Sequence, residues 1–127
     1  RHAIGYALHH PARRHLPVER LDLAKIGTFE FRAPDESRWP ALRLAYQVMA
    51  RGGLSGAVFN AAKETALDGF IAGQIKFTQM SDVVTATLEQ LDVADGHIDA
   101  TMTLDSVLEM DRIARSQARS IIEKRAG

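Results

Sequence analysis

Apolar residues recur every three or four positions along most of this chain, the spacing that predicts amphipathic helices. The clearest case is the segment 54–75, in which one stripe consists of Val58, Ala62, Thr65, Gly69 and Gly73. A glycine in a helix interior costs about 1 kcal/mol relative to alanine, so the two glycines predict that another backbone packs closely against this stripe. We therefore expect 54–75 to be the central helix of a bundle.

A second helix is predicted over 39–51. Asp35, Glu36 and Ser37 supply hydrogen-bond acceptors before it, Pro40 suits its first turn, and Gly52-Gly53 ends it. The spacing of its apolar residues predicts one buried face, made of Leu42, Leu44, Ala45, Val48 and Met49.

Two further helices are predicted downstream. The first begins near residue 79 and carries apolar spacing at Met80, Val83, Val84, Thr87, Leu88 and Leu91. The second is capped by Thr103 or Ser106, and Ser106 with Glu109 has the spacing of a capping box. Its apolar face is expected to comprise Val107, Met110, Ala114, Ala118 and Ile121. Between these helices, Asp95-Gly96 is a turn signal.

A different period occupies residues 28–32, where polar and apolar residues alternate strictly. This alternation predicts a strand with Phe29 and Phe31 on one face, ended by Pro34. The remaining sequence contains no second convincing strand, and a lone strand leaves its backbone donors and acceptors unpaired. We therefore expect its partner in a missing part of the polypeptide or in another subunit. The predicted fold is mainly α: a four-helix bundle preceded by an irregular segment and one connecting β-strand whose partners lie outside the fragment.

Composition excludes several classes of protein. The 127 residues include 16 basic and 16 acidic side chains and no cysteine. The length suits one domain, and the missing cysteines exclude disulfides and thiolate metal sites. A formal charge of zero argues against a general nucleic-acid binder, which needs an excess of Lys and Arg to neutralise phosphates. No apolar run approaches the roughly 18 residues that span a bilayer.

Residues 1–20 differ from the rest because they combine four arginines with four histidines. Pro11 and Pro17 disfavour helix, so this segment is expected to be irregular. Three interpretations are open: packing on protein outside the chain, a metal site formed by His9, His10 and His15, or a phosphate-contacting arm. Adjacent histidines point apart and the total charge is neutral, so the first interpretation is favoured.

No nucleophile with a base and an orienting group stands out at a suitable spacing. His97, in a polar loop, is the only histidine outside residues 1–20. Glu64 and Asp68 lie one helical turn apart and could bind a divalent cation weakly. Such pairs are more often solvated or paired with a basic residue, here Lys63. We therefore predict no catalytic, cofactor-binding or metal-binding residue in this chain.

Six short motifs lie in order over nearly the whole chain. They are Arg1-His2-Ala3-Ile4, Leu21-Asp22-Leu23, Thr28-Phe29-Glu30-Phe31 with Pro34-Asp35, Arg38-Trp39-Pro40 with 42–45, Asn60-Ala61-Ala62-Lys63-Glu64, and Ile75-Lys76-Phe77. Together they resemble the C-terminal third of the 1-deoxy-D-xylulose 5-phosphate reductoisomerase family. The chain departs from that family at Lys63, where Asn is more common, and at Trp39, where Phe is more common. Both departures concern local packing.

The resemblance implies a place for each part of the chain. Residues 1–20 would be the tail end of a central catalytic domain, 21–34 a connecting strand and linker, and 35–127 a C-terminal helical bundle. NADPH-binding and catalytic domains would precede this chain in the same polypeptide. The family uses NADPH and Mg2+ or Mn2+ to convert 1-deoxy-D-xylulose 5-phosphate to 2-C-methyl-D-erythritol 4-phosphate in non-mevalonate isoprenoid biosynthesis. Its catalytic, nicotinamide and metal residues would all lie upstream.

The function that we expect is structural. The chain would brace the catalytic domain and supply part of the contacts of a homodimer, in a bacterial-type cytoplasm and without a nucleic-acid or membrane partner. Candidate structural and interface residues are Phe29, Phe31, Asn60 and Glu64. The alternative is a free-standing helical interaction module whose Arg/His-rich arm binds an acidic partner or nucleic acid. Phosphate binding by that arm would weaken steeply as salt rises.

Overall fold

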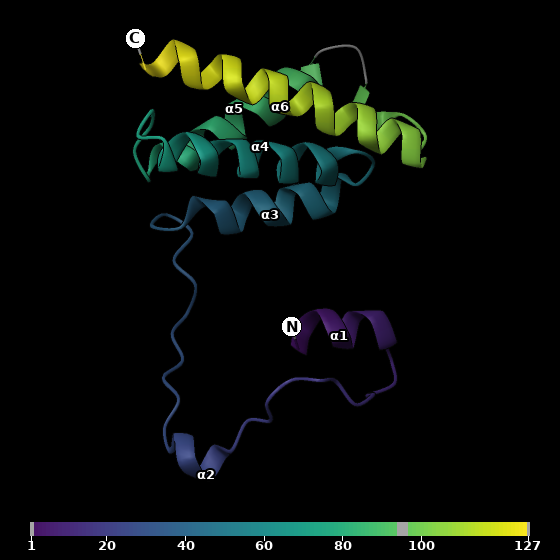
Figure 1. Ribbon diagram of the computed structural model, residues 1–127, viewed down its shortest axis with the longest axis vertical. Coiled ribbons are helices and arrows are strands. Elements are labelled where there is room, and N and C mark those ends of the chain that lie inside the picture. Colours follow the sequence, from purple (N-terminus) through teal and green to yellow (C-terminus); the bar gives the residue numbers. More distant parts are fainter. Residues whose placement is uncertain (1, 94–96, 127) are drawn as a thin grey trace. The chain divides into compact units, whose positions relative to one another are not determined.

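The computed structural model describes residues 2–93 and 97–126 and is mainly helical (Figure 1). The chain divides into two compact units, Arg1–Ala33 and Pro34–Gly127, and each is described by itself. The first unit contains α1 (His2–His9) and α2 (Leu23–Ile26). The second contains α3 (Pro40–Arg51), α4 (Ser55–Ile71), α5 (Gln79–Val93), a short 3-10 helix η1 (His97–Asp99) and α6 (Leu104–Ala126).

Helix α4 is the centre of the second unit. It lies between α3 and α6, and α5 packs across it, so that α4 contacts each of the other three long helices (Figure 1). Its buried face consists of Ser55, Val58, Ala61, Ala62, Thr65, Ala66 and Gly69. The predicted central role of this segment is confirmed.

The predicted end of the central helix was wrong. Helix α4 ends at Ile71, and Gly73 lies beyond it with φ +72°. A left-handed glycine after the last turn ends a helix by redirecting its final hydrogen bonds. Here the N–H of Gly73 donates to the carbonyl of Phe70, and the N–H of Gln74 donates to that of Gly69. Gly73 is therefore a helix terminator rather than part of the packing stripe.

The close approach predicted at Gly69 comes from a side chain rather than a backbone. A Cβ atom added at Gly69 would lie 3.0 Å from Cδ1 of Ile122 on α6. Backbone does approach a glycine elsewhere, at Gly53 between α3 and α4. A Cβ atom there would lie 2.3 Å from the carbonyl oxygen of Ile98, which accepts a hydrogen bond from the N–H of Leu54.

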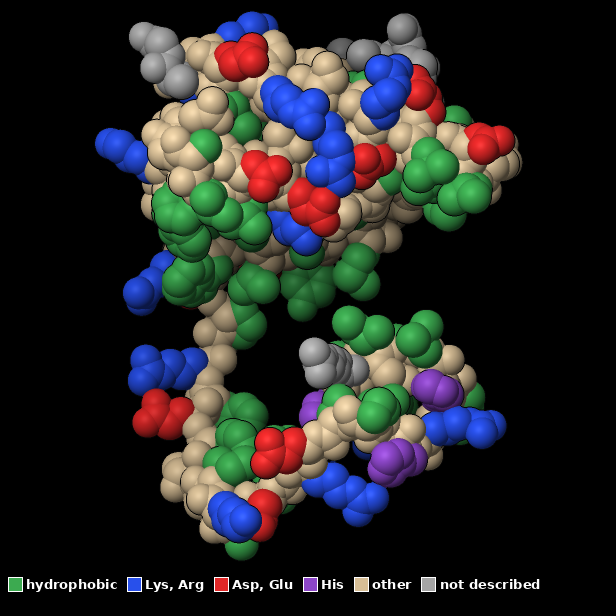
Figure 2. Space-filling view, viewed as in Figure 1, with side chains coloured by type: hydrophobic (Ala, Val, Ile, Leu, Met, Phe, Trp, Pro, Cys, Tyr) green, Lys and Arg blue, Asp and Glu red, His purple; other side chains and the backbone are tan. Residues whose placement is uncertain are grey.

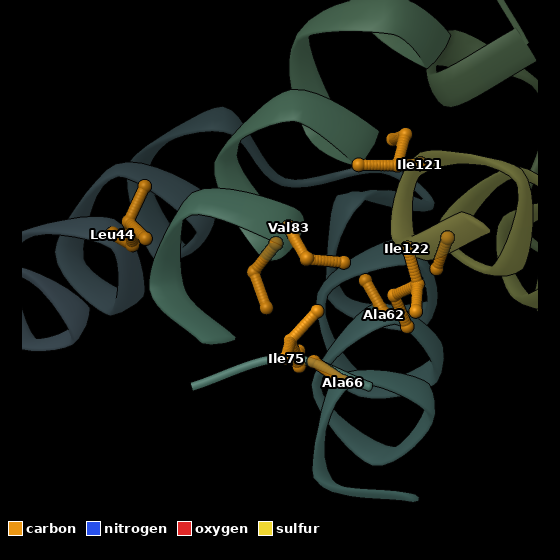
Figure 3. Close-up of a cluster of buried hydrophobic side chains, with 9 residues drawn as sticks. Leu44, Ala62, Ala66, Ile75, Val83, Ile121 and Ile122 are labelled. Atoms are coloured by element: carbon orange, nitrogen blue, oxygen red, sulfur yellow. The ribbon is translucent and has the colours of Figure 1, made fainter. Parts of the chain in front are cut away.

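The hydrophobic core has two clusters. The first cluster joins all four long helices. In Figure 3, Ile122 of α6 and Val83 of α5 lie beside Ala62 and Ala66 of α4. The buried members of this cluster are Leu44, Ala62, Ala66, Ile75, Val83, Val84, Ala118, Ile121 and Ile122. The second consists of Leu54, Val58, Ala61, Leu91, Ile98, Met110 and Ala114. The face predicted for the last helix is thus confirmed at Met110, Ala114, Ala118 and Ile121.

Of the three buried polar side chains in the described residues, Thr65 and Thr87 are satisfied within their own helices, and the Ser55 hydroxyl donates to the carbonyl oxygens of Gly52 and Val48 at 2.6 and 3.1 Å. The Thr65 hydroxyl donates to the carbonyl of Ala61 at 2.9 Å, and the Thr87 hydroxyl donates to that of Val83 at 2.8 Å. A buried hydroxyl without a partner costs free energy, so these bonds allow two polar side chains inside the core.

The predicted buried face of α3 was only partly right. Leu44 is buried and Val48 half-buried, but Leu42 and Met49 are exposed together with Tyr46. Leu42, Tyr46 and Met49 lie on the opposite side of the helix from Leu44, because successive residues advance by about 100°. Apolar spacing alone could not separate the two sides, since both are apolar.

The starts of two helices confirm part of the predicted capping. Oδ1 of Asp35 accepts hydrogen bonds from the N–H groups of Ser37 and Arg38, which builds the turn before α3. At α6 the Thr103 hydroxyl accepts from the N–H of Ser106, and the Ser106 hydroxyl oxygen accepts from the N–H of Thr103. The capping pair is therefore Thr103 with Ser106, and the predicted pair of Ser106 with Glu109 was wrong.

The first unit departs from the irregular segment predicted for residues 1–20, because its first residues form α1. The prolines that disfavour helix stand at positions 11 and 17 and leave residues 2–9 without a proline. Leu16 folds back on this helix, and a Cβ atom added at Gly5 would lie 2.4 Å from its Cδ1 atom. Helix α2 follows, capped by Oδ1 of Asp22.

Residues 27–35 are not part of a strand ladder within the described residues. The rings of Phe29 and Phe31 lie 6.2 Å apart, so the two side chains share one side of the segment, as the alternation predicts. The connecting strand itself stays a prediction that requires a partner outside this chain. In the described ranges no helix is both long and apolar enough to cross a membrane.

Two arginines tie separate elements of the second unit together. Arg115 on α6 donates to Asp111 at 2.7 Å and, across to α4, to Glu64 at 2.6 Å. Arg51 at the end of α3 donates to Asp92 on α5 and Asp99 in η1. The hydrogen bond from Arg115, with smaller contributions from Asn60 and Lys63, lowers the pKa of Glu64 below its ordinary value near 4.5.

We predict that Gly69→Val lowers the free energy of unfolding by about 1–3 kcal/mol, because the added methyl groups must displace Ile122 in a packed core. The matched control is Gly56→Val on the same helix, where an added Cβ atom meets nothing within 4 Å. Urea unfolding of both variants checks this. Equal stability of the two variants would mean that α4 and α6 are not packed as described.

A second prediction concerns pH. A lowered pKa in the folded chain means that the Glu64–Arg115 pair contributes stability above the ordinary pKa and loses it as pH falls through the folded pKa. In Glu64→Gln, the acid-side fall in the free energy of unfolding should therefore be shallower than in the parent chain. Urea unfolding at a series of pH values from about 6 to 3 measures this slope. The exposed Glu123→Gln serves as control, and an unchanged slope in Glu64→Gln would contradict the pairing.

Candidate interaction surface

A groove opens at one end of the second unit, where the start of α3 meets α4 and the α4–α5 connection. Its volume is about 660 Å³, and its walls are mostly apolar. Aromatic side chains contribute from three elements, namely Trp39, Phe59 and Phe77. Leu44, Met80 and Val84 add aliphatic surface. A hollow of this character can bind an apolar group or an apolar protein segment.

The turn before α3 positions the rim of this groove. The Ser37 hydroxyl donates to Oδ1 of Asp35 at 2.6 Å, and the N–H groups of Arg38 and Ser37 donate to the same oxygen. These hydrogen bonds hold the turn and keep the pKa of the Asp35 carboxyl below its ordinary value. The guanidinium of Arg38 then lies 5.3 Å from the ring centroid of Trp39. This cation–π contact places a cationic and an aromatic side chain side by side at the entrance.

The other charged groups at the groove lie on α4 and α5. Lys63 donates to Oδ1 of Asn60 at 3.2 Å. Asp82 pairs with Arg125 of α6 at 3.3 Å. With Asp82 already engaged by Arg125, Arg38 and Lys63 give the rim an excess of positive charge.

A second and smaller hollow of about 190 Å³ lies between α3 and α5. Leu44, Val48, Leu88 and Ile98 form its apolar side, and Arg51 with Asp92 closes its polar side. The hydrogen bonds to Asp99 and Asp92 raise the pKa of Arg51, so the guanidinium stays charged. Because Arg51 pairs with both carboxylates, it links α3 to α5 and η1.

The structure places the four predicted structural and interface residues in two groups. Asn60 and Glu64 lie one turn apart on α4, and the Asn60 amide is 3.4 Å from Oε1 of Glu64. The other oxygen of Glu64 accepts from Arg115, so the basic partner suggested from the sequence, Lys63, was wrong. Phe29 and Phe31 lie in the first unit with 51% and 90% of their surface exposed.

Two of the three histidines considered as metal ligands, His9 and His10, have other contacts. Nδ1 of His9 lies 2.8 Å from the carbonyl oxygen of Gly5, and the His10 ring packs edge-on against Tyr6 at 5.6 Å. Within residues 2–93 and 97–126, no three His, Asp or Glu side chains converge as a metal site. The turn signal Asp95-Gly96 lies outside the described residues, and of His97 only its position at the start of η1 is described.

Two features were missed by reasoning from the sequence. One is Arg115, whose partners Asp111 and Glu64 are 4 and 51 residues away. Its spacing from Asp111 was a visible signal, but its pairing with Glu64 depends on the packing of α6 on α4. The other is the outward side of α3, where Leu42, Tyr46 and Met49 stay exposed. Their spacing predicts an apolar side of the helix, but the tertiary structure decides whether that side packs into the core or stays exposed.

Comparison with known proteins gives a consistent result. The model of the DXP reductoisomerase C-terminal domain matches residues 1–117. A protein from Ruegeria pomeroyi named 1-deoxy-D-xylulose 5-phosphate reductoisomerase is 62% identical over all 127 residues. One of the same name from Sinorhizobium fredii is 48% identical over 123 residues. The chain spans 32% and 30% of the length of these two relatives.

Solved structures agree with the sequence relatives. The reductoisomerase from Zymomonas mobilis in complex with NADPH matches 94% of this chain with a TM-score of 0.72 and 36% identity, over 30% of its own length. A DOX-P reductoisomerase in complex with magnesium matches 94% of this chain with a TM-score of 0.69 and 31% identity, over 31% of its own length. Since the family model covers nearly the whole chain and the helical fold agrees, this chain belongs to the DXP reductoisomerase C-terminal domain family.

Proposed function

We propose that this chain is the C-terminal helical domain of a 1-deoxy-D-xylulose 5-phosphate reductoisomerase of the non-mevalonate isoprenoid pathway. The observation that carries the proposal is the 62% identity, without a break in coverage, to a relative of that name. The complete enzyme would convert its sugar phosphate to 2-C-methyl-D-erythritol 4-phosphate with NADPH and Mg2+ or Mn2+, in the cytoplasm of a bacterial cell and as a homodimer.

The chain's own residues do not fit the metal of that reaction. No group of three potential ligands converges among the described residues. Glu64, one of the two carboxylates considered, is held by Arg115. We therefore assign no step of the reaction to these residues, and we place the NADPH and metal sites in the upstream domains of the same polypeptide.

The role that we assign to this domain is bracing. A four-helix bundle formed by α3 to α6 would support the catalytic domain, and residues 28–32 would form the connecting strand. Phe29 and Phe31 support this assignment, because two exposed phenylalanines on one side of an extended segment expose apolar surface that a partner strand or sheet would cover. That partner would belong to the catalytic domain or to the second subunit.

The alternative of a free-standing nucleic-acid or acidic-peptide module is not favoured. Its basic arm would be residues 1–20, yet the family model matches that arm together with the helices. The first part of the arm is also a helix with apolar residues such as Ile4 and Leu8 exposed. That composition suits packing on protein better than contact with phosphates.

The first test is activity. We predict that the complete polypeptide oxidises NADPH in the presence of 1-deoxy-D-xylulose 5-phosphate and Mg2+, and that the 127-residue chain alone does not. The absorbance of NADPH at 340 nm measures both reactions. Turnover by the 127-residue chain, or none by a folded complete polypeptide, would reject the assignment.

The second test addresses the connecting strand. We predict that Phe29→Asp lowers the thermal stability of the complete polypeptide, because it buries a charge in an apolar contact. Thr28→Asp, on the opposite face of the alternating segment, is the matched control and should have a smaller effect. Calorimetry of the two variants gives the comparison. A loss in Thr28→Asp that equals the loss in Phe29→Asp would argue against a strand with one buried face.

A further inference from the structure

The floor of the groove at the start of α3 belongs to the hydrophobic core. Leu44 and Val84 line the groove, are 8% and 5% exposed, and are members of the first core cluster. Phe59 and Met80 also line it, and both pack against that cluster. Because a packed core holds these side chains in place, the hollow of about 660 Å³ is a fixed feature of the folded unit.

Two walls of the groove each combine an aromatic ring with a basic side chain. On the first wall, just before α3, the Arg38 guanidinium lies 5.3 Å from the centroid of the Trp39 ring. On the second wall, Phe59 and Lys63 are one turn apart on α4. Oδ1 of Asn60 accepts a hydrogen bond from the Lys63 ammonium at 3.2 Å. Each wall therefore presents a flat apolar group beside a cation.

The third wall, at the α4–α5 connection, contributes an aromatic ring but no cation to the lining of the groove. The ring of Phe77 packs edge-on against Phe70, with 5.8 Å between the centroids. Thr78 and Ser81 also line this wall, and the Ser81 hydroxyl donates to the carbonyl of Thr78. The basic groups of the groove are thus confined to the walls formed by the start of α3 and by α4.

Acidic groups beside the groove are paired with arginines of α6. Asp82, which lines the groove, pairs with Arg125 at 3.3 Å. Glu64, the residue after Lys63, pairs with Arg115 at 2.6 Å. Figure 2 shows the same character on a larger scale, with acidic and basic side chains interleaved over α4 and α6 and hydrophobic ones gathered along α3. These two acids therefore do not neutralise the basic groups of the groove.

Arg38 and Lys63 have no acidic partner of their own. In the described parts of the chain, 2–93 and 97–126, no carboxylate lies within ion-pair distance of either side chain. The carboxylate of Asp35, in the turn before α3, instead accepts hydrogen bonds from backbone N–H groups. Two cations at the rim of an apolar hollow attract an anion more strongly than cations in open water, because apolar walls displace part of the water that screens them.

We propose that this groove binds a small organic anion with a flat apolar body. The body lies against the three aromatic rings, and the anionic group contacts Arg38 and Lys63. The volume of the groove lies within the roughly 300–1,000 Å³ that is usual for small-molecule pockets. An uncharged ligand would leave both cations without a partner. A protein surface fits less well, because a stable interface spreads over roughly 20–30 residues a side. This inference goes beyond the proposed function and does not depend on it.

A thiol-protection experiment tests the site in the complete polypeptide. Thr78→Cys places a thiol on the groove wall, and Thr101→Cys places one on an exposed segment that is not part of the groove. The probe is 8-anilinonaphthalene-1-sulfonate, a flat aromatic anion, and its uncharged counterpart is N-phenyl-1-naphthylamine. Maleimide labelling of each thiol, assigned by peptide mapping, is measured over a series of probe concentrations. NADPH is present in excess to fill any nucleotide site.

We expect the sulfonate probe, at ten times its dissociation constant, to slow the labelling of Thr78→Cys about tenfold, because about one tenth of the sites are then free. Labelling of Thr101→Cys should not change. The uncharged probe should protect position 78 only at higher concentrations, because it lacks a group for the cations to contact. Equal protection of both thiols, or none at position 78, overturns the proposal. Slow labelling of Thr78→Cys without any probe would mean that protein already fills the groove, and it overturns the proposal as well.

A double variant tests the part played by the two cations. In the Thr78→Cys background, we expect Arg38→Gln/Lys63→Gln to raise the dissociation constant of the sulfonate probe about tenfold and that of the uncharged probe less than about twofold. The control is Arg43→Gln/Arg119→Gln, which removes two exposed arginines that do not line the groove and should leave both constants unchanged. An equal rise in the two double variants would mean that only net charge matters, and it rejects the site. Neither readout uses reductoisomerase activity, so failure of the proposed function and failure of this site are distinguishable.

Discussion

The second unit depends on the fit between the small residues of α4 and the side chains that neighbouring helices insert against them. Ala61, Ala62 and Ala66 are fully buried, and Gly69 leaves space that Ile122 of α6 fills. Small side chains let helix axes approach closely, and close approach multiplies the weak dispersion contacts that make a dense core favourable. Because α4 touches α3, α5 and α6, a larger side chain on this face would disturb both clusters of the core at once.

Polar interactions refine this packing and set its orientation. Arg115 joins α6 to α4, and Arg51 joins the end of α3 to α5 and η1. Such pairs are partly exposed and contribute modestly to stability, but each has partners on different elements and so favours one register of the helices over others. The surface over α6 and α4 carries paired charges, whereas the outer side of α3 is apolar.

Much of the secondary structure follows from local sequence. The period of the apolar residues, the Asp35 turn, the Thr103 cap and the glycines after α3 predicted the four long helices and most of their ends. The prediction failed where two local rules gave different answers for the same residues. Gly73 continued the helical spacing but its left-handed φ ended α4, and residues 2–9 formed a helix because the prolines of the segment lie after them. The alternating pattern of residues 28–32 predicts a strand, but a strand forms a hydrogen-bonded ladder only when a second segment pairs with it.

The sequence by itself determined the four long helices, that the core is lined with small residues on the central helix, and that the chain resembles one enzyme family. These properties depend on spacing and on residue type, which are local. Only the tertiary structure decided that Arg115 pairs with Glu64 51 residues away, and that Leu44 faces inward while Leu42 and Met49 face outward. Both outcomes depend on which helix lies beside which. When a helix is apolar on two sides, helical spacing cannot determine which side is buried. For α3, its packing on α4 determines that the side of Leu44 is buried.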